Sequence, residues 1–261
     1  MQGAPRIFDA MVNRLGLQID CDASENLPAS GPAIVVANHP FGALESIILG
    51  FLLSKIRADF RFLGSFLFQA LPDISPLVIP VHPPPIPNAD LLNRVAIRNS
   101  LQHLRSGGLL VLFPSGEAGE FSFSKLRPVE RPWSAIAASL MNLSGAPAIP
   151  VFLHGRNSWF FYAASRLHTD VGTVLCAREV MRRAGSTIRV SIGEPITPSE
   201  ALFKNGLRPA TQYLREQTLA LSERRKSPAF TATPASHFSG PAASAKPAYK
   251  NGSPLEFLRK E

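Results

Sequence analysis

Residues 33–48 read AIVVANHPFGALESII and join three kinds of local structure in one short segment. The run from Ala33 to Ala37 is small, β-branched and wholly apolar, which is typical of a strand buried on both faces. Pro40 and Gly42 then interrupt regular structure. The apolar residues 43–56 have the length of a helix. A buried strand that passes through a tight corner into a helix indicates an α/β fold, whose strand ends carry reactive groups.

The same alternation of short apolar runs and amphipathic segments continues along the chain, so the sequence predicts a sheet flanked by helices. No internal repeat interrupts it. Further strands are predicted at residues 60–63, 77–81, 109–113, 148–153 and 187–192. Further helices are predicted at residues 90–105, 132–143 and 198–225. In the helix 90–105, Asp90 is the expected N-cap, and Gly107 is expected to end the helix.

The two ends of the chain differ from this pattern. Residues 6–19 have the apolar spacing of an amphipathic helix, which either packs on the body or lies in a membrane interface. Residues 223–261 are rich in Ser, Pro, Ala and Lys and carry seven basic and three acidic side chains. They predict a disordered basic tail, either simply solvated or attracted to anionic lipid. The aromatic run 159–162 is open to two interpretations, packing in the core or contact with lipid headgroups.

Composition excludes several classes of protein. With 261 residues, 45% of them hydrophobic and 18% charged, the chain is neither disordered nor fibrous, and 24 prolines argue against a helical bundle. The formal charge of +8 favours acidic lipid, phosphate or nucleic acid as a neighbour. Two cysteines predict no disulfide framework or zinc site, and the N-terminus lacks a secretory pattern. We therefore expect the protein in the cytoplasm, with no nucleic-acid module.

Asn38 and His39 follow the first predicted strand directly. Pro40 disfavours a helical conformation at His39, and Gly42 permits a sharp bend, so the imidazole is expected at a strand-to-helix corner. A carboxylate that holds one imidazole nitrogen leaves the other free to accept a proton. His39 is therefore the candidate general base.

Asn38 and His39 resemble the first motif of the lysophospholipid (glycerolipid) acyltransferase family, in which Asn-His is followed by four residues and an Asp. In that family the His deprotonates an acceptor hydroxyl, which attacks an acyl thioester, and the Asp orients the His. The matching position here is Leu44, and the carboxylate is Glu45, one residue later. Six residues on a helix rotate by about 240°, so His39 and Glu45 meet only if the corner between them is non-helical.

Residues 109–120, LLVLFPSGEAGE, resemble the third motif of the family, Phe-Pro-Glu-Gly-Thr-Arg, which helps to bind the glycerol phosphate of the acceptor. The resemblance implies that the turn 113–117 and Asn38 bind the acceptor, and it offers a second carboxylate that could orient His39. Phe113, Pro114 and Gly116 match the motif, whereas Ser115 replaces its Glu, Glu117 its Thr and Ala118 its Arg.

The other two motifs bear on the acceptor. Residues 146–151, APAIPV, are similar to the fourth motif, whereas the Arg of the second motif corresponds to Gln69. Both missing arginines, at positions 69 and 118, would hold phosphate by bidentate pairing. The resemblance is closest to a bacterial hemolysin-like branch linked to ornithine-type aminolipids, which implies a lyso-aminolipid acceptor without phosphate. The basic residues that follow the third motif either replace the missing arginine or simply lie on a solvated loop; these are Lys125, Arg127 and Arg131.

The resemblance covers roughly residues 33–196 and implies a mixed, largely parallel sheet flanked by helices. Together with the spacing and composition of the two ends, it divides the chain into an amphipathic segment at 1–30, an acyltransferase domain at 31–222 and the tail at 223–261. It implies transfer of a fatty acyl group from acyl carrier protein or coenzyme A to the hydroxyl of a lyso-aminolipid or lysophospholipid, at the inner face of the cell membrane, without a metal or redox cofactor. His39 is the expected base, oriented by Glu45 or Glu117. The alternatives are a non-enzymatic lipid-surface protein and an acyl thioesterase.

Overall fold

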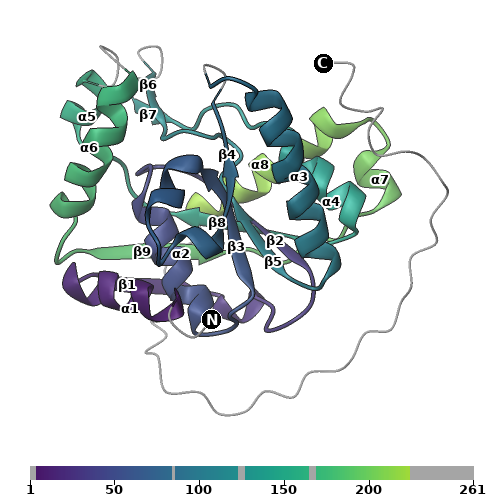
Figure 1. The fold of residues 1–261 in the computed structure, drawn as a ribbon, viewed down its shortest axis with the longest axis horizontal. Helices are drawn as coiled ribbons and strands as arrows, with labels where there is room; N and C mark the ends of the chain where they lie inside the picture. The colour runs from purple at the N-terminus through teal and green to yellow at the C-terminus, as the bar shows by residue number, and fades with distance from the viewer. Residues whose placement is uncertain (1–3, 84–85, 123–126, 165–168, 224–261) are drawn as a thin grey trace. The chain divides into compact units, whose positions relative to one another are not determined.

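A computed structural model of the chain describes residues 4–83, 86–122, 127–164 and 169–223 (Figure 1). Within this part, the described residues belong to one compact unit, Met1–Phe230. The predicted basic tail lies outside the described residues except for Glu223, and so does Lys125.

A mixed sheet of seven strands lies at the centre of the described fold. From edge to edge the strands are β1 (Gln18–Asp22), β9 (Thr187–Ile192), β8 (Ala148–Leu153), β2 (Ala33–Ala37), β5 (Leu109–Leu112), β3 (Phe60–Ser65) and β4 (Val78–Val81). Neighbouring strands run parallel, except that β8 and β9 are antiparallel. The structure therefore confirms a mixed, largely parallel sheet.

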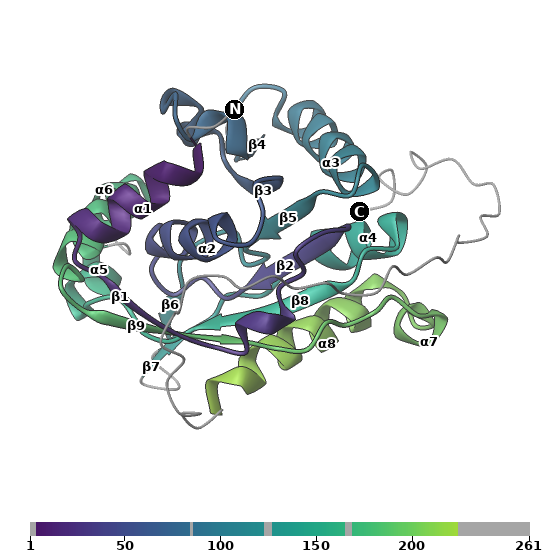
Figure 2. The ribbon, with the colours of Figure 1, turned by 90° about the horizontal axis from the view of Figure 1, so that it is seen from below.

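Helices cover both faces of this sheet. The side chains of alternate β2 residues point to opposite faces, so Val35 joins one apolar cluster and Ile34 the other. Figure 2 shows α2 and α8 on opposite sides of the sheet. The first cluster includes α1 (Ala4–Arg14) and α2 (Leu44–Ser54), and the second includes α3 (Ala89–Arg105), α4 (Ile136–Ser144) and α8 (Leu207–Ala220).

The N-terminal amphipathic helix packs on the body. Phe8 and Val12 of α1 are buried against α2, and Lys55 pairs with Asp9 at 2.6 Å. This packing explains why α2 is apolar around most of its circumference, because it lies between the sheet and α1. None of the helices in the described ranges is both long enough and apolar enough to cross a bilayer.

Several elements differ from the sequence prediction. Strand β1 begins within the segment 6–19 expected to be helical and overlaps its last two residues, because the helix ends at Arg14 and Gly16 turns the chain with a φ of 60°. Asn88 is the N-cap of α3, so Asp90 falls in the first turn, whereas Gly107 does follow its end.

The structure adds β6 (Glu120–Ser122), β7 (Arg127–Val129), α5 (Trp159–Ala164) and α6 (Thr169–Arg182), and the last predicted helix divides into α7 (Glu200–Phe203) and α8. Short 3-10 helices are η1 (Ser24–Asn26), η2 (Phe66–Ala70), η3 (Ser75–Leu77) and η4 (Leu221–Glu223).

The parallel strands bring distant segments to one edge of the sheet. Val36 in β2 pairs with Leu112 in β5, and Ala37 pairs with Val151 in β8, so all three strands end at the same level. The residues that follow these strands, 38–43, 113–117 and 154–158, are therefore neighbours in space although far apart in sequence.

One close contact between helices generates a stability prediction. A β-carbon on Gly50 of α2 would lie 2.6 Å from Cζ of the buried Phe8 ring. Gly50→Ala should therefore lower the free energy of unfolding by about 1 to 3 kcal/mol through overpacking, although Ala at an unhindered helix position would stabilise by about 1 kcal/mol. Urea denaturation measures this difference. Gly64→Ala in strand β3 is the control for steric space, because nothing lies within 4 Å of where its new β-carbon would be. Equal stability of wild type and Gly50→Ala would contradict the packing argument.

Candidate active site

The corner between β2 and α2 is non-helical and holds the first candidate residues. Gly42 has a φ of 90°, and α2 begins only at Leu44. Glu45 lies in the first turn of α2 and is fully buried. Its Oε1 accepts hydrogen bonds from the backbone N–H groups of Phe41, at 2.5 Å, and Gly42, at 3.1 Å. The carboxylate thus folds back over the corner, where the positive end of the helix dipole also favours it.

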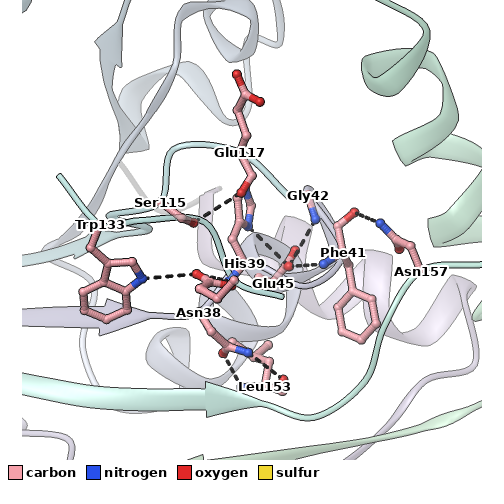
Figure 3. A network of polar contacts seen from close by, with 11 residues as sticks. Asn38, His39, Phe41, Gly42, Glu45, Ser115, Glu117, Trp133, Leu153 and Asn157 are labelled. Carbon is pink, nitrogen blue, oxygen red and sulfur yellow. Dashed lines mark hydrogen bonds and ion pairs between the residues drawn. The ribbon is translucent and has the colours of Figure 1, made fainter. Parts of the chain in front are cut away.

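This geometry brings Glu45 to His39. Nδ1 of His39 lies 3.3 Å from Oε1 of Glu45, in contact but outside the alignment of a good hydrogen bond (Figure 3). Among the described residues no group bonds the opposite ring nitrogen, Nε2, and 11% of the side chain stays exposed. The imidazole is thus mostly buried but keeps one nitrogen free to exchange a proton.

The surroundings of His39 make its imidazole more basic. Burial is the largest single influence and acts to lower its pKa, but the charge and hydrogen-bonding capacity of Glu45, with the charge of Glu130, outweigh it and raise the pKa above 6.5. A carboxylate beside one nitrogen stabilises the imidazolium that forms when the other accepts a proton. The arrangement therefore suits a general base.

Phe113 fixes the plane of the imidazole. Its ring stacks on His39 with centroids 4.4 Å apart and an angle of 13° between planes. The backbone carbonyl of His39 also accepts a hydrogen bond from the N–H of Gly119 at 3.1 Å. The resemblance implies that Phe113 belongs to an acceptor-binding turn, and the structure places its ring against the imidazole of His39.

The rest of the third-motif turn is held by local hydrogen bonds. The Ser115 hydroxyl donates to the carbonyl of Glu117 at 3.2 Å, Gly116 has a φ of 72°, and the carbonyl of Pro114 accepts from the N–H of Ser134 at 2.9 Å. The turn therefore has a defined shape beside His39.

Glu117 does not contact His39. Its side chain is 64% exposed and pairs with Arg131 at 3.0 Å, and Figure 3 shows its carboxylate pointing away from the imidazole. Arg131 also contacts Glu120 at 3.5 Å. Of the two carboxylates expected to orient His39, the structure brings only Glu45 into reach.

Asn38 holds two strand ends together. Its side chain is buried, donates from Nδ2 to the carbonyl of Leu153 at 3.0 Å and accepts from the N–H of Leu153 at 2.7 Å (Figure 3). The amide thus imitates one more residue pair between β2 and β8. Because this tie immediately precedes His39, it fixes where the base emerges from the sheet.

Residues outside the motifs support the corner from the far side. Asn157 donates from Nδ2 to the carbonyl of Phe41 at 3.1 Å. Gly155 leaves room for the Phe41 ring, because a β-carbon there would lie 2.9 Å from Cε1. Cys176 of α6 lies against Gly42, and burial, with the charges of Glu45 and Glu179, raises its thiol pKa to about 11. The only sequence signal for these residues is the strand-end position of 154–158.

His154, which directly follows β8, contacts the neighbouring strand β9. Its Nε2 lies 3.0 Å from Oγ of Ser191, and burial, aided by the charge of Arg189, lowers its pKa. Among residues 4–83, 86–122, 127–164 and 169–223, no group of three or more His, Cys, Asp or Glu side chains is arranged to hold a metal ion.

Comparison with known proteins gives relatives of one kind. Two curated relatives, from Phocaeicola vulgatus and Bacteroides thetaiotaomicron, are named lyso-glycine lipid O-acyltransferase. Each is 25% identical over 196 residues, which is 72% of this chain and 68% and 70% of the relatives, respectively. The crystal structure of the 1-acyl-sn-glycerophosphate acyltransferase PlsC from Thermotoga maritima aligns with a TM-score of 0.52 at 17% identity, over 85% of this chain and 81% of that one. This likeness supports the fold.

The match to a family extends over the whole site. The model of a family described as "Acyltransferase" matches residues 3–227. That range contains the His39 corner, the turn 113–117 and the supporting segment 154–158. This chain therefore belongs to the acyltransferase family, and it is an enzyme of that class.

Proposed function

We propose that this acyltransferase moves a fatty acyl group from the thioester of acyl carrier protein or coenzyme A to the hydroxyl of a lyso-lipid. The observation that carries the proposal is the placement of His39, with Nδ1 against the buried Glu45 and Nε2 without a partner among the described residues. An imidazole held in this way can remove a proton from a hydroxyl group.

The reaction balances with these groups alone. The acceptor hydroxyl gives its proton to Nε2 of His39 while its oxygen attacks the thioester carbonyl carbon. The C–O bond forms, the C–S bond breaks, and the departing thiolate takes the proton back from His39. The nucleophile belongs to the acceptor, so no acyl-enzyme is required, and rate comes from positioning and proton removal.

The acceptor is proposed to be a lyso-aminolipid rather than a lysophosphatidate. The names of the two curated relatives support an acceptor with an amino-acid headgroup. Ala118, at the motif position of the phosphate-binding Arg, packs against the corner, 3.3 Å from where a β-carbon on Gly42 would lie. Arg131, the nearby guanidinium, is engaged by Glu117 and Glu120. Each of these features argues against a dedicated phosphate site.

Peripheral contact with a membrane is proposed at α5. Trp159 and Phe160 are 58% and 56% exposed, and they directly follow the site segment 154–158. The guanidinium of Arg178 lies 4.8 Å from the centroid of the Phe160 ring. Exposed aromatic rings beside a cation suit the headgroup region of an anionic bilayer, where a lyso-lipid would be presented.

Removal of the base tests the mechanism. His39→Ala should lower acyl transfer by about 10²- to 10⁴-fold, measured as labelled acyl groups passed from a thioester to lyso-lipid in vesicles. His154→Gln is the matched control, because that imidazole bonds Ser191 and should leave transfer nearly unchanged. Normal transfer by His39→Ala would refute the mechanism.

The pH dependence tests the role of Glu45 separately. The neutral imidazole is the active form, so kcat/KM should rise with pH through the raised pKa of His39. Glu45→Gln removes the charge that stabilises imidazolium, so the rise should move to lower pH by about 1 unit and the plateau should fall. A profile identical to that of wild type would show that Glu45 does not orient the base.

A choice of acceptors tests the substrate class. The enzyme should acylate lyso-glycine lipid with a kcat/KM at least about tenfold above that for lysophosphatidate, since a strong bidentate phosphate contact is missing. Product analysis by mass spectrometry makes the comparison. A preference for lysophosphatidate would contradict the proposed acceptor. Free fatty acid as the sole product would indicate a thioesterase, and binding without turnover would indicate a non-enzymatic protein.

Vesicle sedimentation tests the membrane face. The double variant Trp159→Ser and Phe160→Ser should bind vesicles of phosphatidylethanolamine and phosphatidylglycerol at least about tenfold more weakly, because burial of even one aromatic ring contributes about 1.5 to 3 kcal/mol and about 1.4 kcal/mol is a factor of ten. Tyr213→Ser on α8 is the control, since its ring is 42% exposed and lies on a different helix. Equal binding by wild type and the double variant would place the contact elsewhere.

A further inference from the structure

Glu130 is a carboxylate that no motif singles out, yet it contacts the catalytic corner. Its Oε1 and Oε2 lie 3.2 Å and 3.3 Å from the backbone nitrogen of His39, which donates to the carboxylate. The indole N–H of Trp133 donates to Oε1 at 3.2 Å. Glu130 lies just after β7, 91 positions beyond His39 in the chain. Its side chain therefore links a distant loop to the peptide of the base.

The charge of Glu130 is coupled to the imidazole. Burial is the main cause that raises the pKa of Glu130, and the hydrogen bonds from the His39 N–H and the Trp133 indole act to lower it. In the other direction, the charge of Glu130 helps to raise the pKa of His39. A half-buried carboxylate interacts with a nearby charge more strongly than an exposed one, because less water screens it.

The position of Glu130 also accounts for a departure from the third motif. Ser115 stands where the resemblance expects a Glu. The segment that carries Glu130 and Trp133 meets this turn directly, because the N–H of Ser134 donates to the carbonyl of Pro114 at 2.9 Å. A carboxylate is thus present beside this turn, although it comes from position 130 instead of position 115.

We propose that Glu130 is a positioning residue for acyl transfer, which anchors the backbone of His39 and shares with Glu45 the stabilisation of the imidazolium. This inference rests on the proposed function of His39 as the base. When His39 takes the proton of the acceptor, two carboxylates lie near the new charge: Glu45 contacts the ring, and Glu130 accepts from the backbone N–H of the same residue. Loss of either one destabilises the charged state and therefore the step that forms it.

The other polar groups around His39 and Glu130 do not provide the negative charge that would stabilise the imidazolium. Arg131 pairs outward with Glu117 and Glu120. Arg215 of α8 donates to the backbone carbonyl of Glu130 at 3.3 Å. On the far side of the corner, the raised pKa of Cys176 keeps its thiol neutral near pH 7. The anionic charge that lies near His39 within the described residues therefore comes from Glu45 and Glu130.

The test measures the His39 pKa directly, by NMR titration of the full chain labelled at histidine, so that it does not depend on turnover. In Glu130→Gln the amide oxygen still accepts the His39 N–H but the charge is lost. The pKa of His39 should fall by about 0.5 to 1 unit. Glu130→Asp retains a charge and should restore most of the shift. Glu120→Gln is the matched control, an exposed carboxylate of the neighbouring strand that should leave the pKa unchanged.

Acyl transfer is then measured on the same variants. Glu130→Gln should lower the plateau of kcat/KM by roughly threefold to tenfold and move its rise to lower pH. An unmoved His39 pKa, or a Glu130→Gln enzyme as active as wild type at every pH, would overturn the proposal. If wild type itself transfers no acyl group, the proposed function fails, whereas the titration still decides whether Glu130 is coupled to His39.

Trp133→Phe provides a second variant in case Glu130→Gln does not fold. It removes only the indole donor to Oε1 and leaves the carboxylate charged. We expect an unchanged His39 pKa, because the charge remains, with a lowered kcat, because the carboxylate is less well fixed. Circular dichroism melting checks that each variant is folded. Normal kcat in Trp133→Phe together with normal kcat in Glu130→Asp would argue that the exact placement of the carboxylate is unimportant and would refute a positioning role.

Discussion

The burial of the Glu45 carboxylate is the constraint on which the site depends. A fully buried charge is costly unless hydrogen bonds and opposite charge offset it. Here the compensation comes from the N–H groups of Phe41 and Gly42, the start of α2 and the imidazole of His39. These donors converge only because Gly42 takes a φ of 90° with Cys176 packed against it. The same turn that satisfies the carboxylate therefore sets the place of the base.

Contacts from distant parts of the chain then make this corner rigid. Asn38 binds Leu153, Phe41 is held by Asn157, and the peptide of His39 is held by Glu130. These partners are 91 to 116 positions apart in the sequence. Leu153 and Asn157 come to the corner because β8 ends at the same edge of the sheet as β2, whereas Glu130 comes from the segment after the separate β6–β7 pair. An imidazole supported in this way is fixed before substrate arrives, which is what the proposed role of His39 as a base requires.

The elements that can be predicted from the sequence are those marked by residues close together in the chain. The apolar runs of β2 and β8 and the corner at His39 are confirmed, because burial on both faces and helix-breaking residues leave a mark on the chain itself. Strand β1, with the sequence QIDCD, was missed because an edge strand needs no continuous apolar run. Glu130 was missed because its role depends on tertiary contacts alone, and a Glu between charged and proline residues resembles any solvated loop.

The displaced acid of the first motif also has a physical explanation. Leu44, at the position where the family has Asp, is fully buried and packs in the apolar cluster with Ile48, one turn later on the same face of α2. An acid at residue 44 would therefore point into that apolar cluster. Residue 45 lies about 100° further around the helix, which turns its side chain toward the corner, and the additional methylene of Glu extends its reach to His39. The face of α2 that meets the corner therefore decides which position must carry the acid. Moving the carboxylate from position 44 to position 45 keeps it in contact with His39.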